Sequence, residues 1–202
     1  MHAALVLATT NLDKVREIRA LLDGVDVEIV GLDRWPDLAP PEETGATFAE
    51  NAALKARYYS RLTGMPAIAE DSGLEVDALG RAPGVESARF AGADTSYADK
   101  FDEIYRQLAA TGDRDSTARF VCAVAVADGD AILFEARGTV EGRISPEPRG
   151  SNGFGYDPIF FYPPEGRTLG EISDDQKRAV SHRGAAFRQV RQFLAKGGFA
   201  TA

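Results

Sequence analysis

Residues 9–14, with the sequence Thr-Thr-Asn-Leu-Asp-Lys, are a candidate anion-binding segment close to the N-terminus. An apolar run at residues 3–8 is typical of a buried parallel strand, and apolar residues at helical spacing follow over residues 12–22. A junction from strand to helix directs backbone N–H groups and the positive end of the helix dipole outward. The threonine and asparagine side chains add donors and the lysine adds a cation, so the segment could hold phosphate groups. The P-loop pattern G-x-x-x-x-G-K is absent, and a helix-capping asparagine beside a solvated lysine is the alternative interpretation.

Two pairs of adjacent acidic residues could contribute to a divalent metal site. Glu42 and Glu43 precede a helix that a capping-box pattern starts at Thr47. Residues 70–73, Glu-Asp-Ser-Gly, follow a short apolar strand. The ends of strands are where open α/β sheets place their ligands, and carboxylate oxygens suit Mg²⁺. An acidic loop for the first pair and an Asp-Ser-Gly turn for the second are the structural alternatives.

Lysine is scarce in this chain, which has 5 Lys but 18 Arg. Three of the five, Lys14, Lys55 and Lys177, fall in segments that could do chemistry. Lys55 also lies four residues after Asn51, so the two share one face of the expected helix. Because lysine supplies a compact ammonium charge, this distribution supports phosphate binding. A polar, solvated helix face is the alternative for the second lysine.

Two segments in the C-terminal third could bind an aromatic ligand. Residues 150–158 place three glycines around Phe154 and Tyr156, either of which could stack on a base. Residues 181–183, Ser-His-Arg, lie one turn after Lys177 and offer several hydrogen-bond donors. A zinc site is not expected there, because the histidine has no second ligand at a suitable spacing. Inward-packed aromatics and a structural histidine are the alternatives.

Composition narrows the class of protein. The 202 residues include 31 acidic and 23 basic side chains, a net charge of −8, which disfavours duplex nucleic acid as a partner. The single cysteine, Cys122, lies in an apolar run, where a buried and inert thiol is expected, and it excludes a disulfide framework. Without an apolar stretch of about 18 residues or a basic N-terminal region, we expect no membrane span and no secretory signal, hence a cytoplasmic protein.

The pattern of elements predicts a mixed α/β fold with helices on both faces of a central sheet. A hairpin is expected around residues 128–130, and it suggests a second lobe. Strands are expected at residues 3–8, 25–30, 66–69, 74–78, 119–127, 131–138 and 140–144, and helices at residues 12–22, 47–62, 97–109 and twice after residue 173. Ser173 and Gln176 form a second capping-box pattern at the start of the first of these last two helices.

Taken together, these six segments resemble the Ham1-like inosine triphosphate pyrophosphatases, which remove non-canonical purine nucleoside triphosphates of the inosine, deoxyinosine and xanthosine type. The resemblance extends from Ala4 to about Leu194, with the motifs in the order of the family. It implies an elongated α/β fold with two lobes around a long mixed sheet, a single domain over residues 1–202, a central substrate cleft and a homodimer. Many members have Asp where this chain has Glu70.

The resemblance also implies a mechanism, in which Mg²⁺ assists the attack of water on the α-phosphorus to give the nucleoside monophosphate and pyrophosphate. Asp71 would be the catalytic residue and would hold the metal with Glu42, while Glu43 is a weaker candidate ligand. Donors from His182 and Arg183 would select 6-oxo purines. The implied substrate-binding residues are Thr9, Thr10, Asn11, Leu12, Asp13, Lys14, Lys55, Ser72, Phe154, Gly155, Tyr156, Asp157, Lys177, His182 and Arg183.

Two other functions compete with this interpretation. One is a different nucleotide enzyme, such as another phosphohydrolase or a kinase, although the signatures of kinases are absent. The other is a non-catalytic nucleotide-binding module, which would not need Asp71 and Glu42 together. Release of pyrophosphate from inosine triphosphate with Mg²⁺ would separate these functions.

Overall fold

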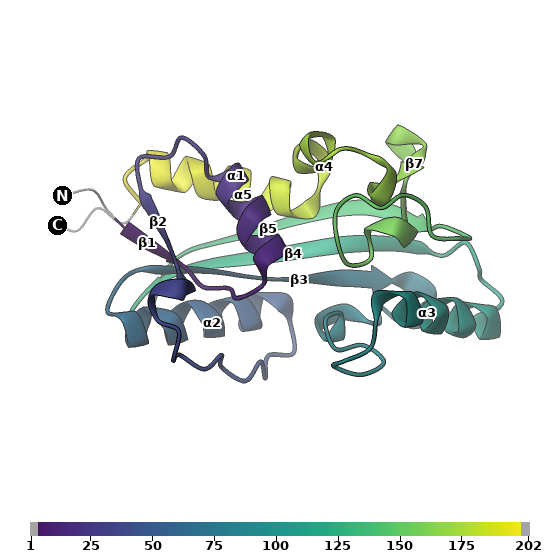
Figure 1. Ribbon diagram of the computed structural model, residues 1–202, viewed down its shortest axis with the longest axis horizontal. Helices are drawn as coiled ribbons and strands as arrows, with labels where there is room; N and C mark the ends of the chain where they lie inside the picture. Colours follow the sequence, from purple (N-terminus) through teal and green to yellow (C-terminus); the bar gives the residue numbers. More distant parts are fainter. Residues whose placement is uncertain (1–3, 199–202) are drawn as a thin grey trace. The chain divides into compact units, whose positions relative to one another are not determined.

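The computed structural model describes residues 4–198 and contains a seven-stranded mixed sheet with flanking helices (Figure 1). The sheet order is β2-β1-β3-β4-β5-β6-β7. The strands are β1 Ala4–Leu7, β2 Glu28–Gly31, β3 Ala67–Val76, β4 Thr117–Asp128, β5 Ala131–Ile144, β6 Phe160–Tyr162 and β7 Arg167–Thr168. The α-helices in this part of the chain are α1 Leu12–Leu21, α2 Phe48–Thr63, α3 Tyr97–Thr111, α4 Asp174–Val180 and α5 His182–Ala195. The predicted α/β class with a mixed sheet is confirmed.

The first three strands of the sheet order are parallel, and their register determines where polar residues lie. β1 pairs with β2 and β3, and Leu7, the last residue of β1, lies opposite Ile68. Because β3 continues to Val76, Glu70 and Asp71 follow the point where β1 ends and the chain turns into α1. β5, β6 and β7 pair in the antiparallel direction. Of the predicted strand at residues 3–8, residue 3 lies outside the described residues.

The chain forms two compact units. Unit 1 comprises the residues up to Asp71, Cys122–Gly138 and the residues from Arg183 onward, and unit 2 comprises Ser72–Val121 and Thr139–His182. Strands β3, β4 and β5 each contribute residues to both units. The single domain with a central cleft stays a prediction.

In unit 1, helices lie on both faces of the sheet. Figure 1 shows α1 and α5 on one face and α2 on the other. Each fully buried aliphatic or aromatic side chain in such a layer contributes about 1.5–3 kcal/mol to stability. On the α2 face, the buried alanines 52, 53 and 56 leave room for the helix to lie close to the sheet. The core on the face of α1 and α5 includes Leu5, Leu7, Ile18, Ile68, Val124, Phe187 and Val190.

In unit 2, α3 packs its apolar face into a separate core. Phe101, Ile104 and Leu108 are buried there, and Tyr105 packs against the same core, as their helical spacing predicted. The helix extends to Thr111, slightly beyond the predicted end. The other members of this core include Leu74, Val76, Phe120, Val140, Tyr156, Ile159 and Phe160.

β3 is where the structure differs most from the sequence prediction. Two short strands with a turn between them were expected, but β3 is continuous from Ala67 to Val76. Residues 70–73 are therefore strand residues, and both the strand-end and the turn interpretations are wrong. Gly73 serves a close approach rather than a turn, because a Cβ there would lie 2.3 Å from the Ser87 Oγ and 2.6 Å from the Gly84 carbonyl oxygen.

β5 also differs from the prediction, which placed a separate strand at residues 140–144. The strand runs without a break from Ala131 to Ile144, and Val140 continues the alternation of exposed and buried residues. The hairpin that joins β4 to β5 through residues 128–130 is confirmed. β2 begins at Glu28, three residues later than expected.

The predicted helix caps are confirmed in one case and only half present in the other. Ser173 and Gln176 form the full capping box at the start of α4. At α2, the Thr47 side chain accepts from the backbone N–H of Glu50, but the Glu50 carboxylate accepts from the Ala46 N–H rather than from the cap residue. Thr47 nevertheless starts the helix where the sequence placed it.

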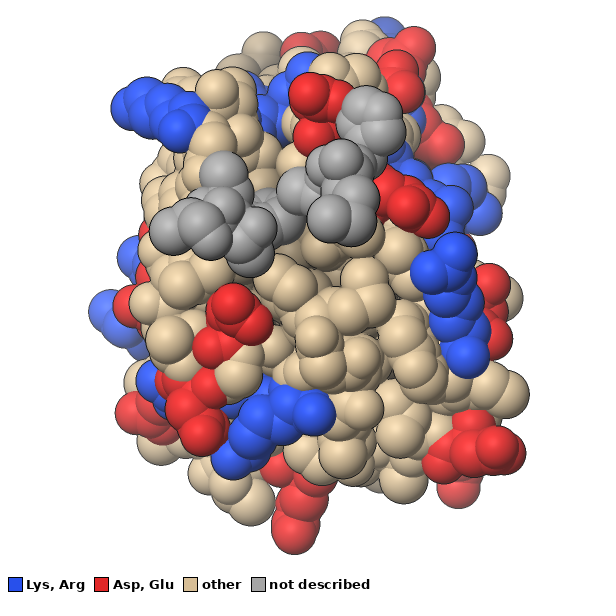
Figure 2. All heavy atoms as spheres, turned by 90° about the vertical axis from the view of Figure 1, so that its left-hand side faces the viewer, with Lys and Arg blue, Asp and Glu red and all other residues tan. Residues whose placement is uncertain are grey.

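The surface carries both signs of charge. On the face shown in Figure 2, Lys and Arg side chains are interspersed with Asp and Glu and do not gather into one continuous band. No helix among the described residues is both long enough and apolar enough to cross a bilayer.

Candidate active site

The junction between β1 and α1 is a capped helix start. The Asn11 side chain accepts from the backbone N–H groups of Asp13 and Lys14, at 3.0 and 3.2 Å. The Thr9 hydroxyl accepts from the Asn11 N–H at 3.2 Å. The expectation that these helix N–H groups project freely is therefore wrong for Asp13 and Lys14. Leu12, at the first position of the helix, is 80% exposed.

Glu70 and Asp71 point to opposite faces of the sheet, because successive side chains of a strand alternate. Glu70 contacts side chains from α1 and α5, and Asp71 contacts side chains from α2. Both carboxylates are almost completely buried. The two acids therefore belong to separate clusters rather than to one acidic pair.

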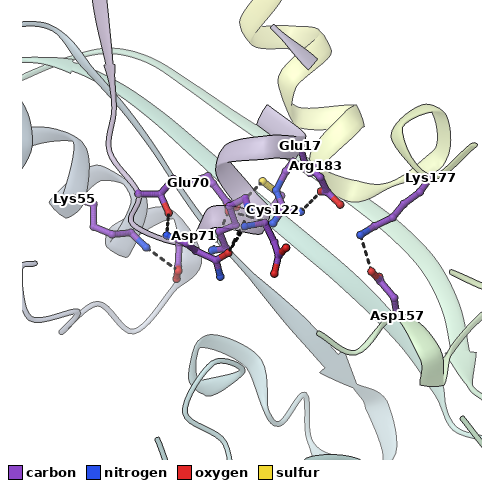
Figure 3. Close-up of polar contacts among 12 residues, drawn as sticks. Glu17, Lys55, Glu70, Asp71, Cys122, Asp157, Lys177 and Arg183 are labelled. Carbon is purple, nitrogen blue, oxygen red and sulfur yellow. Dashed lines mark hydrogen bonds and ion pairs between the residues drawn. The ribbon is translucent and has the colours of Figure 1, made fainter. Parts of the chain in front are cut away.

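The Asp71 cluster consists of Asp71, Lys55, Asn51 and Glu43. The Lys55 ammonium lies 3.0 Å from the Asp71 Oδ1 and 2.9 Å from the Glu43 Oε1 (Figure 3 shows the Lys55–Asp71 contact). The Asn51 Nδ2 donates to the Asp71 Oδ2 at 3.2 Å. Asn51 and Lys55 reach the same carboxylate because they are four residues apart on α2.

The loop before α2 is fixed to this cluster through Asn51. The Gly45 N–H donates to the Asn51 Oδ1 at 2.7 Å, so the asparagine amide bridges the loop and Asp71. A Cβ at Gly45 would lie 2.6 Å from that oxygen, which explains why a glycine is required. This bridge places Glu43 beside Lys55, whereas Glu42 is exposed to solvent.

The charges of Asp71, Lys55 and Glu43 shift one another's pKa values or oppose the effect of burial. Burial raises the pKa of Asp71 above its ordinary value, although the charge of Lys55 opposes this shift. Burial alone would lower the pKa of Lys55, but the charges of Asp71 and Glu43 outweigh it and raise that pKa. A buried carboxylate of raised pKa beside a cation is an arrangement typical of functional sites.

The same cluster fits the predicted divalent metal. One ammonium nitrogen contacts oxygens of both Asp71 and Glu43, so two carboxylates already share one cation. Mg²⁺ takes oxygen ligands and is usually held by one or two carboxylates together with substrate phosphates. The part of the chain that the structure describes has no group of three or more His, Cys, Asp or Glu side chains that could hold a metal ion. The two carboxylates would therefore need substrate phosphates as further ligands.

The Glu70 cluster lies on the other face of β3 and consists of Glu70, Lys14, Arg183, Glu17 and Cys122 (Figure 3). The Glu70 Oε1 lies 2.9 Å from the Lys14 ammonium and 3.1 Å from the Arg183 guanidinium. The Arg183 Nη1 also donates to the Glu17 Oε2 at 2.6 Å. Burial alone would raise the pKa of Glu70, but Arg183 and Lys14 hold it well below its usual range.

Arg183 and His182 are both buried. Arg183 is 2% exposed and joins α5 to β3 and α1 through its two carboxylate partners. The His182 ring stacks on Phe120, with 4.8 Å between ring centroids. These contacts assign structural roles to both side chains, and a direct contact of either with a purine base stays a prediction.

In unit 2, the glycine-rich loop forms the Phe154 cluster, which consists of Phe154, Asp157 and Lys177. The Lys177 ammonium lies 2.6 Å from the Asp157 Oδ2 (Figure 3) and 4.6 Å from the centre of the Phe154 ring. Asp157 also accepts from the Phe154 backbone N–H at 2.8 Å. Phe154 is half-buried, whereas Tyr156 is 3% exposed and donates its hydroxyl to the Ser87 carbonyl. Of the two aromatics, Phe154 is therefore the one that could stack on a base.

Three remaining predicted binding residues have these positions. Thr10 is exposed in the segment between β1 and α1. Ser72 is half-buried on β3, directly after Asp71, and Gly155 lies in the loop of the Phe154 cluster with a left-handed backbone, at φ +67°.

Sequence reasoning did not name Glu17, expected Cys122 to be inert, and gave Asn51 and Glu70 no role in the implied site although both lie in segments that it singled out. The spacing of Asn51 and Lys55 was a usable signal, and so was Glu17, three residues after Lys14 on the same helix face. The partners of Glu70 come from segments far apart in the chain, and local spacing contains no signal for them.

Comparisons with known proteins agree with this fold. The model of the Ham1 family matches residues 5–193. A dITP/XTP pyrophosphatase of Symbiobacterium thermophilum is 50% identical over 193 residues, which cover 94% of this chain and 94% of that protein. A Ham1 protein structure from Coxiella burnetii superposes with a TM-score of 0.90 at 40% identity, over 96% of this chain and 99% of that one. A Ham1 protein structure from Staphylococcus aureus gives a TM-score of 0.85 at 37% identity, over 96% and 99% of the two chains. This chain therefore belongs to the Ham1 family.

Proposed function

We propose that this protein hydrolyses non-canonical purine nucleoside triphosphates, those of inosine, deoxyinosine and xanthosine, to the monophosphate and pyrophosphate. Family membership and the names of relatives such as the Symbiobacterium enzyme support this function. The single observation that carries it is the Asp71 cluster, in which a buried carboxylate of raised pKa contacts a buried lysine. Such a pair offers a base for water and a cation for phosphate, which a binding module does not need.

Asp71 is the proposed base. Its raised pKa makes its carboxylate a better proton acceptor than an exposed aspartate, and Asn51 holds its second oxygen in place. Asp71 would orient a water molecule toward the α-phosphorus and take its proton. Lys55 would move from its carboxylate partners to phosphate oxygens, while Lys14 would donate to phosphate oxygens from its position beside Glu70. There the two charges would stabilise the transition state.

Mg²⁺ is the proposed metal, held by Asp71 and a carboxylate of the Glu42–Glu43 pair. When bound, it supplies positive charge that neutralises phosphate oxygens and lowers the pKa of water. The contact with Lys55 favours Glu43 over Glu42 as the second ligand. This ranking reverses the order that the family resemblance implied.

The Phe154 cluster is the proposed contact for the base and sugar. Its half-buried aromatic ring could stack on a purine, and Lys177 and Asp157 fix the loop that presents the ring. The homodimer and the cytoplasmic location stay predictions that rest on the family and on composition.

Turnover of inosine triphosphate in H₂¹⁸O tests the proposed function. Attack of water at the α-phosphorus predicts inosine monophosphate carrying the label and unlabelled pyrophosphate. Inosine diphosphate with free phosphate would indicate a different phosphohydrolase. Saturable binding of the nucleotide without any product would indicate a non-catalytic module.

A further inference from the structure

Cys122 is the member of the Glu70 cluster that comes from β4, the strand next to β3. Its Sγ lies 3.2 Å from the Glu70 Oε2, and the side chain is fully buried. Figure 3 shows the sulfur beside Glu70 and Arg183. The two oxygens of Glu70 therefore have different partners, since Oε1 contacts Lys14 and Arg183.

The Cys122 thiol acts as a hydrogen-bond donor here. Burial and the charge of Glu70 raise the pKa of the thiol well above its ordinary value, so it keeps its proton. A buried carboxylate oxygen without a donor costs free energy. Among the residues that the structure describes, Cys122 is the donor at the Glu70 Oε2.

The second oxygen matters because the last torsion of a glutamate side chain has no sharp minimum. A carboxylate that has donors at only one of its oxygens can still turn about this torsion. Such a turn displaces the Oε1 that Lys14 and Arg183 contact. The Lys14 ammonium lies 2.9 Å from the Glu70 Oε1, and the Lys14 side chain is only 18% exposed. The position of Glu70 therefore determines much of where this ammonium lies. A donor at Oε2 opposes this rotation.

We propose that Cys122 is a positioning residue, whose thiol fixes Glu70 and thereby the Lys14 ammonium that binds the triphosphate. The effect on turnover rests on the proposed function. The effect on Lys14 itself does not, because it follows from the contacts in the Glu70 cluster alone.

Two substitutions of equal size separate positioning from packing. Cys122→Ser keeps a hydrogen-bond donor and Cys122→Ala removes it, while both substitutions reduce the side-chain volume by a similar amount. We expect Cys122→Ala to lower kcat/KM for inosine triphosphate about five- to tenfold and Cys122→Ser to stay within about threefold of the unsubstituted protein. Both are assayed well below their measured unfolding temperatures. Equal losses in the two variants would show a packing effect and overturn the proposal.

A double-substitution cycle tests whether the effect passes through Lys14. In a Lys14→Ala background, removal of the thiol should change kcat/KM by less than about twofold, because the group that it positions is gone. A cost as large as in the unsubstituted background would overturn the proposal.

The reactivity of lysines provides a readout that does not need turnover. Competitive acetylation followed by mass spectrometry should show Lys14 about threefold or more reactive in Cys122→Ala than in Cys122→Ser, since its contact with Glu70 is looser. The exposed Lys196 should be equally reactive in both and serves as the internal control. If the protein releases no pyrophosphate, the proposed function fails, but this measurement still decides the role of Cys122. Equal Lys14 reactivity in the two variants would refute it.

Discussion

Arg183→Ala should destabilise the fold strongly, because Arg183 neutralises two carboxylates from a buried position. Its guanidinium contacts Glu70 at 3.1 Å and Glu17 at 2.6 Å, and the Glu70 side chain is fully buried. Removing one partner from a buried ion pair costs about 3–5 kcal/mol. We expect the lower end, about 3 kcal/mol, because Glu70 keeps its contacts with Lys14 and Cys122. The equilibrium constant for unfolding would then rise by roughly two orders of magnitude.

Urea denaturation followed by circular dichroism measures this loss. With a slope of about 3 kcal/mol per molar urea, the midpoint should fall by about 1 M. Gln192→Ala is the control, since Gln192 is exposed on the same helix, and the free energy of unfolding of this variant should change by about 0.5 kcal/mol or less. A loss below about 1 kcal/mol for Arg183→Ala, or equal losses in both variants, would refute the structural role of Arg183.

Three further predictions concern turnover of inosine triphosphate. Lys14→Ala and Lys55→Ala should each lower kcat/KM at least about tenfold, about 1.4 kcal/mol, because each removes a proposed phosphate-binding charge; unchanged values would limit these lysines to structural roles. Glu43→Gln should weaken the Mg²⁺ dependence of the rate more than Glu42→Gln, since Glu43 shares Lys55 with the proposed base, and the opposite ranking would restore Glu42 as the ligand. Phe154→Ala should raise KM about tenfold with little change in kcat, because base stacking contributes about 1–3 kcal/mol; an unchanged KM would exclude stacking on this ring.

Local patterns in the sequence were sufficient for much of the fold. The apolar run of β1, the asparagine cap of α1 and the threonine cap of α2 each depend on a few neighbouring residues. Apolar spacing likewise predicted α3 and its buried face. These features could be predicted because each is determined within a single element.

β3 could not be predicted correctly, because a glycine at position 73 is compatible both with a turn and with a strand that another segment approaches closely. Glycine after Asp-Ser is typical of a turn, but here it allows Ser87 and Gly84 to approach the strand. That error also placed Glu70 and Asp71 together. Recognising a continuous strand would have placed them on opposite faces.

The charge partners of the site were also beyond local reasoning. Arg183 is 113 residues from Glu70 and 166 residues from Glu17 along the chain. Their contacts depend on how α5 and α1 pack against the sheet, and the sequence carries no spacing rule for that packing. By contrast, the scarcity of lysine in this chain drew attention to Lys55, which the structure places beside Asp71.

Turnover of inosine triphosphate by Asp71→Asn is the most direct test of the proposed catalytic role of the Asp71 cluster. Asparagine keeps the shape of the side chain and can still contact Asn51, but it cannot take a proton from water or hold Mg²⁺ well. We predict that this variant keeps its circular dichroism spectrum and loses pyrophosphate release by at least about a hundredfold in kcat, as expected when a general base is removed. A folded Asp71→Asn protein with a kcat close to that of the unsubstituted protein would contradict the assignment of Asp71 as the catalytic residue.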